Sequence, residues 1–568
     1  MPDVVNPEKP CTVPAAQGFS VVYKNRFLYS KYDPCKTVLQ AVQNLSILPD
    51  TLVLCYSPCL WYGFDALLAK LQQNCFIAVY EADSRLHETA VEHIPAAAHD
   101  SRVLFFSPDQ ASLLPDLIQN TYRTVTPADI SFPEAGTFRH ILRIDLSAGI
   151  QFSPALYNSL YAVCEQAIQV FWKNRLTLVK FGRLFSRNLF KNIASLPTSI
   201  DLASYMNTVE KPILVAGAGE SLEHTLQNLN PGSLSRLCII AADAALPVFL
   251  QHHITPDAVA GMESQLAIEK AYIGSGTKSH PFIFFGDIVS RPYIPEKIQS
   301  RACWFASAYD NTAFFRNLEN CSILPPVIEP LGSIGLTAVK LALLLRKDQN
   351  VPVFVTGLDF SYSAGVTHAR GAPAQTARLC NTSRLIPSSC YSAAFSFGTS
   401  TAVGKDGRKI ITTAALSGYA RSFMERFAGT VKLFDAGISG IPLGIPRIRE
   451  DDIKIFLSSE SRFMHPAFSE QSRNNQEKRK PIYDFYDREE KALMMLKDDL
   501  SGKSVKAEAE LHKELYSLLK EREYLYLHFP DGYRISMDTS FLKRVRAEID
   551  FFLKDIRTAR TLLNANNS

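Results

Sequence analysis

The stretch ILVAGAGESLE, residues 213–223, decides the fold class, because an apolar run leads through a glycine-rich turn into a helical pattern. A strand, turn and helix of this kind is the unit of an open α/β sheet. Gly217 and Gly219 would let the backbone turn tightly with its N–H groups bare, and Ser221 would cap the helix. With the helix dipole added, the turn predicts a phosphate site, although packing alone explains such turns equally well.

Three further polar segments, at residues 239–250, 329–345 and 353–371, each stand beside an apolar run. We interpret all four segments as the ligand-binding ends of strands in one sheet. Asp243 directly follows a predicted strand, and Glu263 ends the next apolar run. These two acids could therefore face one crevice, where they would receive ribose hydroxyls or hold a metal.

A second helix start lies in EPLGSIGLTAVKLALLL, residues 329–345. Gly332 and Ser333 stand ahead of a strongly apolar helical run, where backbone amides and a hydroxyl can meet an anion. Two such helix starts in one domain would suit a ligand that carries both a phosphate and a carboxylate.

The segment at 353–371 supplies candidate acid and base groups. Asp359 closely follows the predicted strand, and Tyr362, Thr367 and His368 come next in a loop flanked by glycines. A carboxylate and an imidazole on a loop fixed by a central strand can exchange protons with a substrate. His368 could equally be a hydrogen-bonded structural residue.

Length and composition describe a folded protein of several domains. The chain has 568 residues, of which 46% are hydrophobic and 20% charged, so we expect three or four domains. A net charge of +4 gives no support for a nucleic-acid partner. The start MPDVVNPEKP is unlike a signal peptide, and no window holds the roughly 18 apolar residues that span a bilayer, so we expect a cytoplasmic protein.

The eleven cysteines are scattered singly, which favours buried reduced thiols. No Cys or His pair is echoed by a second pair at ligand spacing, so we predict no zinc site. The sequence does not determine the oligomeric state.

Apolar runs and helical patterns divide the chain into four predicted segments. Residues 1–150 alternate strands and helices and predict a Rossmann-like α/β domain. Residues 151–204 predict a basic helical linker, 205–449 the central α/β domain and 450–568 a helical module. The linker has no acid from Gln166 to Ile200, which favours either an acidic partner or a solvated basic face.

The N-terminal segment has the pattern of a nucleotide fold without a working site. Its second predicted strand ends in Glu81 and Asp83, where a dinucleotide site would hold a ribose. Its first strand, however, leads into Ser57, Pro58 and Cys59 instead of glycines, which would keep a pyrophosphate away. We therefore predict a degenerate structural copy.

At the four polar segments between residues 213 and 371, the sequence resembles the motility accessory factor (Maf) family of flagellin glycosyltransferases. The core domain of that family is shared with archaeal hydroxymethylpterin pyrophosphokinases. The resemblance covers roughly residues 15–445 and is strongest in 211–371. Four family motifs are matched in order: G-x-G-x-S-L, an alanine/aspartate run with P-D, G-S-V-x-x-x-A, and G-x-D-L-x-Y…T-H-x-x-G. The matching residues are Gly217, Gly219, Ser221, Leu222, Ala242, Asp243, Ala244, Leu246, Pro256, Asp257, Gly332, Ser333, Ile334, Ala338, Gly357, Asp359, Phe360, Tyr362, Thr367, His368 and Gly371.

The resemblance implies a central sialyltransferase-like nucleotide-sugar domain with flanking domains that meet a protein acceptor. It implies an enzyme that moves a nonulosonic acid, of the pseudaminic or legionaminic type, from a CMP carrier onto Ser or Thr of flagellin, with Mg2+ as an optional cofactor. Combining the resemblance with the residues themselves, we predict that His368 and Asp359 are catalytic. The predicted donor-binding residues are Gly217, Gly219, Glu220, Ser221, Asp243, Glu263, Gly332, Ser333, Tyr362 and Thr367.

The sequence departs from the family pattern at Glu263, where aspartate is more usual, and at Asp435 and Ile438 in the closing segment. Two other functions stay open. One is a pterin pyrophosphokinase, with Asp243 and Glu263 holding Mg2+ for ATP. The other is a non-catalytic flagellin-binding chaperone that has kept the fold.

Overall fold

The computed structural model describes residues 9–119, 131–133, 136–275, 282–307, 313–363, 365–388, 398–458, 467–468, 475–503 and 507–565. The chain divides into two compact units. Unit 1 comprises 1–181, 309–313 and 527–536, and unit 2 comprises 182–308, 314–526 and 537–568. The 40-residue helix α5 (Pro154–Ile193) contributes to both units. The division into four segments stays a prediction.

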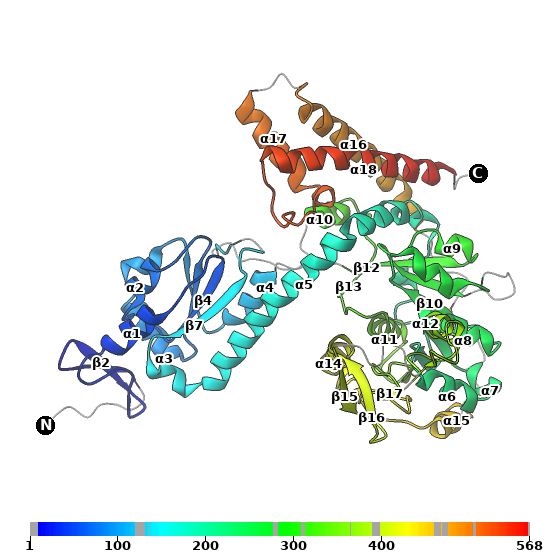
Figure 1. The fold of residues 1–568 in the computed structure, drawn as a ribbon, viewed down its shortest axis with the longest axis horizontal. Helices are drawn as coiled ribbons and strands as arrows, with labels where there is room; N and C mark the ends of the chain where they lie inside the picture. Colours follow the sequence, from blue (N-terminus) through cyan, green and yellow to red (C-terminus); the bar gives the residue numbers. More distant parts are fainter. Residues whose placement is uncertain are drawn as a thin grey trace. The chain divides into compact units, whose positions relative to one another are not determined.

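Unit 1 contains a four-stranded parallel sheet, drawn in blue and cyan in Figure 1. The strand order is β6-β5-β4-β7, which leaves β6 and β7 at the edges. Apolar clusters cover both faces, which explains why the central strands are almost continuously apolar. The strands are β4 (Thr51–Tyr56), β5 (Phe76–Tyr80), β6 (Val103–Phe106) and β7 (His140–Asp145).

The remaining elements of unit 1 flank this sheet. A small antiparallel sheet contains β1 (Cys11–Pro14), β2 (Phe19–Tyr23) and β3 (Arg26–Phe27). The helices, besides the first part of α5, are α1 (Lys36–Asn44), α2 (Phe64–Ala69), α3 (Ser84–Glu92) and α4 (Leu114–Gln119). The predicted α/β class of this part of the chain is confirmed.

Unit 2 contains an eight-stranded sheet in the order β13-β12-β11-β10-β9-β8-β14-β17, and every neighbouring pair is parallel. The strands are β8 (Ile213–Ala216), β9 (Cys238–Ala242), β10 (Ala258–Gly261), β11 (Ile283–Asp287), β12 (Arg301–Ser307), β13 (Val327–Ile328), β14 (Val353–Thr356) and β17 (Leu433–Asp435). A separate hairpin is formed by β15 (Thr399–Val403) and β16 (Lys409–Thr413).

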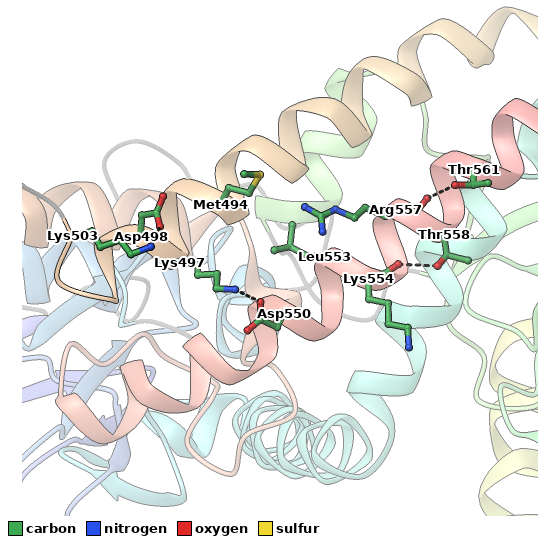
Figure 2. Close-up of a pocket in the computed structure, with 10 residues that line it drawn as sticks. All are labelled: Met494, Lys497, Asp498, Lys503, Asp550, Leu553, Lys554, Arg557, Thr558 and Thr561. Carbon is green, nitrogen blue, oxygen red and sulfur yellow. Dashed lines mark hydrogen bonds and ion pairs between the residues drawn. The ribbon is translucent and has the colours of Figure 1, made fainter.

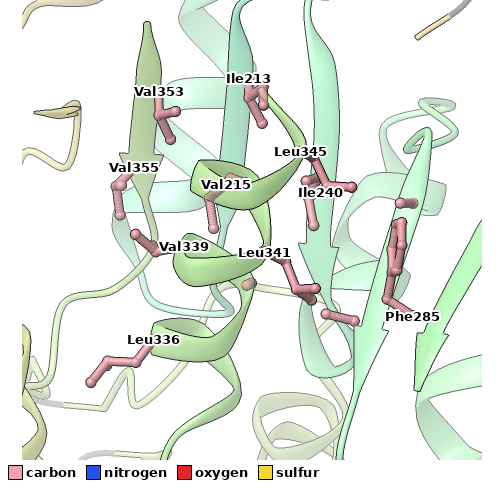
Figure 3. Close-up of a cluster of buried hydrophobic side chains, with 14 of the residues drawn as sticks. Ile213, Val215, Ile240, Phe285, Leu336, Val339, Leu341, Leu345, Val353 and Val355 are labelled. Atoms are coloured by element: carbon pink, nitrogen blue, oxygen red, sulfur yellow. The ribbon is translucent and has the colours of Figure 1, made fainter. Parts of the chain in front are cut away.

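Helix α11 (Ile334–Leu345) lies against the middle of this sheet, and Figure 3 shows its apolar side chains over β8, β9 and β14. Leu336, Val339 and Leu341 are fully buried there with Val215 and Val355. A helix that is buried on most of its surface is apolar nearly all round, as this one is. The core therefore fixes the position of the residues that begin α11.

Helices of unit 2 cover both sheet faces and form the C-terminal module. They are α6 (Ser221–Asn228), α7 (Pro231–Leu234), α8 (Leu246–Gln251), α9 (Ile294–Lys297), α10 (Ala313–Asn320), α12 (Pro373–Cys380), α14 (Ala414–Phe427), α15 (Glu450–Ser458), α16 (Arg479–Asp499), α17 (Glu508–Lys520) and α18 (Thr539–Ala565). The predicted C-terminal helical module is confirmed.

The basic residues in the second part of α5 are used within unit 2. Arg183 Nε lies 2.8 Å from Glu548 Oε2, and Arg187 Nε lies 2.9 Å from Asp555 Oδ2, both on α18. Both guanidinium groups also lie over the Phe551 ring. These two arginines of the predicted basic face are therefore paired with acids of α18, although their side chains stay partly exposed.

A shallow groove of about 540 Å³ separates α16 from α18 on the C-terminal module (Figure 2). Lys497 Nζ and Asp550 Oδ1 form an ion pair of 2.5 Å across it. A second ion pair joins Lys503 Nζ to Asp498 Oδ1 at 3.3 Å. Since ion pairs between exposed side chains contribute little to stability, we interpret this groove as ordinary solvated surface.

Candidate functional site

The strand order of unit 2 reverses between β8 and β14. From β8 the chain continues through β9 to β13 on one side, and β14 then returns to the other side of β8 and leads to β17. Ligands of open α/β sheets bind outside the carboxyl ends of the strands at such a point. Here two of the predicted segments meet, because Gly217 N–H donates to Thr356 O at 2.9 Å and Gly219 N–H to Gly357 O at 2.8 Å.

The expectation of bare amides in the glycine turn is therefore wrong. Besides Gly217 and Gly219, Ser221 N–H is also occupied, because it donates to Asp359 Oδ2 at 2.9 Å. Ser221 is the first residue of α6, and its side chain does not cap the helix. A Cβ at Gly217 would lie 2.4 Å from Gly357 O, so the glycine is needed for the close approach of two loops. An internal carboxylate stands where a phosphate was expected.

Asp359 is 3% exposed and caps the N-terminus of α6 with one of its two oxygens. Burial raises the pKa of its carboxyl, and the charge of Lys405 acts in the opposite direction. The other oxygen, Oδ1, has no hydrogen-bond partner within the described parts of the chain. Asp359 therefore retains an unused acceptor, or a proton, at the switch point.

Lys405, in the turn of the β15–β16 hairpin, is a functional candidate that sequence reasoning missed. Its Nζ lies 2.7 and 2.9 Å from the two oxygens of Asp435, and both side chains are 2% exposed. A lysine in the polar stretch GKDGRK looks like an ordinary surface turn. The only signal was indirect, since Asp435 belongs to the closing segment of the family resemblance.

The backbone of residues 435–441 lies across the ends of β8, β14 and β17. Ser439 N–H donates to Ser221 Oγ at 3.1 Å, and Ile441 N–H donates to Asp359 O at 2.8 Å. Gly440 has a φ of +99°, and a Cβ there would lie 2.4 Å from Asp359 O. This segment therefore packs directly against Ser221 and Asp359.

His368 lies in the loop after β14, next to the glycine turn, because Ala369 N–H donates to Ala218 O at 2.9 Å. Its Nδ1 lies 3.0 Å from Thr367 Oγ1. Thr367 is in turn fixed by Gln375 Oε1, which accepts its N–H at 3.1 Å. Burial, with the Arg378 charge second, lowers the pKa of His368. The imidazole is therefore oriented and held neutral.

Tyr362 and Glu220 occupy the outer part of the same loop region. Tyr362 exchanges backbone hydrogen bonds with Ile411 of β16, at 2.7 and 3.2 Å. Glu220 Oε2 accepts the Ser363 hydroxyl at 2.5 Å. Both side chains are half-buried, so they line the approach to the loop.

The start of α11 is the open helix end of this region. Gly332 has a φ of +71° and Ser333 makes no side-chain cap bond. Among the described residues no acceptor is recorded for the N–H groups of residues 334–336. Leu358 packs close to both Gly217 and Gly335, so α11 begins beside the glycine turn. Of the two predicted anion sites, the one at Gly332 and Ser333 is therefore the site with backbone N–H groups that have no recorded acceptor among the described residues.

Asp243 and Glu263 lie close enough to interact electrostatically. Asp243 is 4% exposed, and burial raises its pKa to about 7, opposed by its bond from Ala244 N–H and reinforced by the charge of Glu263. Glu263 is exposed, and its Oε1 accepts Gln265 N–H at 3.0 Å. The structure thus brings the two acids together as expected.

Asp287, at the end of β11, is a further buried acid that the sequence did not single out. Burial raises its pKa to about 6, and its Oδ2 has no hydrogen-bond partner in the described structure. Across the described ranges, no group of three Cys, His, Asp or Glu side chains is arranged to hold a metal ion, and no helix combines the length and apolarity of a membrane span.

Comparison with known proteins places this geometry in context. The family described as 6-hydroxymethylpterin diphosphokinase MptE-like matches residues 187–365. An uncharacterized protein of Treponema pallidum (strain Nichols) is 32% identical over 579 residues, covering 96% of this chain and 94% of that protein. The solved MAf glycosyltransferase from Magnetospirillum magneticum AMB-1 matches with a TM-score of 0.54 at 13% identity, covering 99% of this chain and 91% of the other.

These matches confirm the family resemblance and the fold that it implied. The match to the solved structure extends over nearly the whole chain, and the MptE-like match covers most of the strands that form the switch point. The chain belongs to the same family as the Treponema pallidum protein, with an MptE-like domain in unit 2 and the fold of the Maf glycosyltransferases.

Proposed function

We propose that this protein is a glycosyltransferase that moves a nonulosonic acid, of the pseudaminic or legionaminic type, from a CMP-activated donor to Ser or Thr of flagellin. The observation that carries the proposal is the loop after β14, which holds Asp359 against the start of α6 and His368 next to the glycine turn, at the carboxyl ends of the strands. The fold shared with a MAf glycosyltransferase supports the reaction class. The donor and the acceptor rest on the sequence resemblance.

The donor phosphate would bind at the start of α11. The amides of residues 334–336 and the Ser333 hydroxyl offer donors where the helix dipole favours negative charge. The Gly217–Ser221 turn would position this ligand through packing, since its amides are already paired. Asp243 and Glu263, at the ends of the next two strands, would receive the ribose hydroxyls, and Mg2+ could join them there.

His368 is the better of the two candidate bases. In the tautomer with hydrogen on Nδ1, the ring donates to Thr367 Oγ1, whose hydroxyl lies 3.5 Å from Gln375 Oε1. Gln375 Nε2 then donates to Gly365 O at 3.2 Å. This chain leaves the Nε2 lone pair of His368 available, and the lowered pKa keeps it unprotonated near neutral pH.

The transfer forms one bond to the sugar and breaks another. The acceptor hydroxyl oxygen forms a bond to the anomeric carbon of the sugar, and its proton passes to His368 Nε2. The bond from that carbon to the phosphate oxygen breaks, and CMP leaves with the bonding electron pair. Preorganised amides at the start of α11 would stabilise the charge that develops on the departing phosphate.

The first experiment measures the melting temperature of the full chain with CMP, CDP, UDP, GDP, ATP with Mg2+, or S-adenosylmethionine. A ligand that binds the native state raises the melting temperature. A shift with CMP supports the proposal, and mass spectrometry of flagellin incubated with a CMP-nonulosonic acid then tests the transfer directly. Flagellin whose mass stays unchanged under these conditions would contradict the proposal.

Replacing the base should separate chemistry from binding. His368→Ala should lower kcat by about 10²-fold or more, because general base catalysis contributes roughly that much. The shift in melting temperature with CMP should stay within error. His93→Ala, an exposed histidine of unit 1, is the matched control. Unchanged turnover in His368→Ala would remove this residue from the mechanism.

The MptE-like match favours one alternative, a pterin pyrophosphokinase. That enzyme would be stabilised by ATP with Mg2+ in the same experiment, and CMP would have no effect. A protein stabilised by none of the nucleotides but retaining flagellin in a pull-down would instead be a binding protein that has kept the fold.

A further inference from the structure

A long groove follows one edge of the unit 1 sheet. Its first part, about 310 Å³, is lined by residues 46–51, the start of β7 and the first part of α5. A second part, about 470 Å³, continues along α5 and shares Arg139, Ile168 and Gln169 with the first. Leu176, 71% exposed, ends it. The site in unit 2 uses none of these residues.

The start of β7 lines this groove through His140, Ile141 and Leu142. Among the described residues β7 pairs with β4 alone, so its outer edge has no strand partner there. His140 N–H donates to Asp50 O, and Leu146 N–H donates to Tyr56 O on the β4 side. Because backbone groups alternate in direction along a strand, the N–H groups of residues 141, 143 and 145 point outward. No acceptor is recorded for them among the described residues.

The walls of the groove combine apolar surface with positive charge. The residues that line its second part include Arg139, Lys173, Trp172 and Leu176 and no acid. The Arg139 guanidinium lies 4.2 Å from the centre of the Trp172 ring. Lys173 has no recorded ion pair in the described structure, in contrast to the basic residues farther along α5, which α18 neutralises.

We propose that this groove binds an extended peptide of a partner protein, which adds as a fifth strand beside β7 and places acidic side chains near Lys173. An unpaired strand edge is a template for such addition, in which main-chain hydrogen bonds supply affinity. Alternate side chains of the peptide enter the first part of the groove, where Leu48, Ile141, Leu142 and Ile168 supply apolar surface beside the polar Glu165 and Gln169. The acidic end fits the second part, where no ion pair of Lys173 is recorded among the described residues, whereas Arg139 Nε lies 3.8 Å from Asp50 Oδ2.

The test uses the full chain and a fluorescein-labelled peptide, Val-Thr-Val-Thr-Val-Thr-Glu-Glu, followed by fluorescence anisotropy. Ile141→Pro removes an outward N–H without touching the β4 ladder, and it should weaken binding at least tenfold. Ile141→Ala, which removes the side chain but keeps the N–H, should weaken binding less than threefold. Lys173→Glu should weaken the glutamate peptide at least tenfold and a Lys-Lys-ended peptide less.

Hydrogen exchange of the wild-type chain gives a second readout that does not depend on the variants folding. Added peptide should protect the amides of residues 141, 143 and 145, whereas those of 142 and 144 are already protected by β4. Absence of binding by the wild type, equal affinity in Ile141→Pro, or protection confined to other strands would each overturn the proposal.

Discussion

The two parallel sheets carry an acid at the same topological position, but they use it differently. Glu81 follows β5, the strand beside β4, and Asp243 follows β9, the strand beside β8. Glu81 Oε1 accepts the Tyr157 hydroxyl at 2.7 Å and Asp83 N–H at 3.0 Å. Asp243 accepts only Ala244 N–H from its own turn, as far as the described residues show. The position alone does not make a ligand site; the acid must also be left unused.

The turns after β4 and β8, in contrast, are both closed by internal groups. In unit 1 the Tyr29 hydroxyl donates to Pro58 O at 2.9 Å and accepts Leu60 N–H at 3.0 Å, so an internal side chain fills the turn after β4. Ser57 Oγ is bonded to Ser147 Oγ at 2.8 Å. In unit 2 the amides of the turn after β8 are paired with the loop after β14, and the open helix end is the start of α11, a different element.

The largest effect should come from removing Lys405, one of the buried cations of unit 2. Lys405→Met leaves Asp435 buried without its counter-charge and should lower the free energy of unfolding by about 3–5 kcal/mol. Urea unfolding measures the loss, and Lys405→Met with Asp435→Leu should restore much of it. A loss below about 1 kcal/mol would show that this pair does not hold the site together.

The pH dependence of stability should expose Asp243. Burial raises its pKa to about 7, so between about pH 4 and about pH 7 the folded protein holds a proton that the unfolded chain has lost. The free energy of unfolding therefore falls as pH rises through that window, by up to about 4 kcal/mol at about 1.4 kcal/mol per unit. Asp243→Asn should flatten that part of the curve, and parallel curves would contradict the assignment.

The contact between the two loops should tolerate no side chain. Gly357 has a φ of +66°, and a Cβ would lie 2.2 Å from Gly217 O, so Gly357→Ala should cost about 3 kcal/mol. Gly418, in α14 with nothing within 4 Å of its Cβ position, is the control, and Gly418→Ala should stabilise by up to about 1 kcal/mol. Equal melting temperatures for the two variants would refute the close approach.

The smallest effect on nucleotide binding should come from Glu81 of unit 1, the predicted degenerate structural copy of a nucleotide fold. Glu81→Gln can keep its bonds to Tyr157 and Asp83, and it should leave the CMP-induced shift in melting temperature unchanged. Asp243→Ala should reduce that shift. A reduced shift with Glu81→Gln would break the comparison, because unit 1 would then take part in nucleotide binding.

Much of the fold could be predicted because parallel strands covered on both faces are continuous apolar runs. The apolar run that opens the stretch 213–223 forms β8, and the strand predicted to end in Glu81 is β5, which ends at Tyr80. The helical linker predicted at 151–204 contains α5. These features are local, so periodicity and turn residues were enough to find them.

The site was harder to predict because its contacts join distant residues. The glycines at 217 and 219 suggested a ligand, but they are required by the loop after β14, about 140 residues later in the chain. Lys405 lies in a stretch with the composition of a surface turn and becomes buried only through Asp435. His368, Asp243 and Glu263 remain predictions as site residues; Asp243 and Glu263 follow the ends of β9 and β10, and His368 lies in the loop after β14.

The segment 435–441 also sets a condition on how the protein is made. Synthesis starts at the N-terminus, and domains fold as units while the chain emerges. Ser221 and Asp359 leave the ribosome long before Ser439 and Ile441, which hold them in place. The switch point therefore cannot be completed until residue 441 has emerged, and nascent chains that stop earlier lack a finished site.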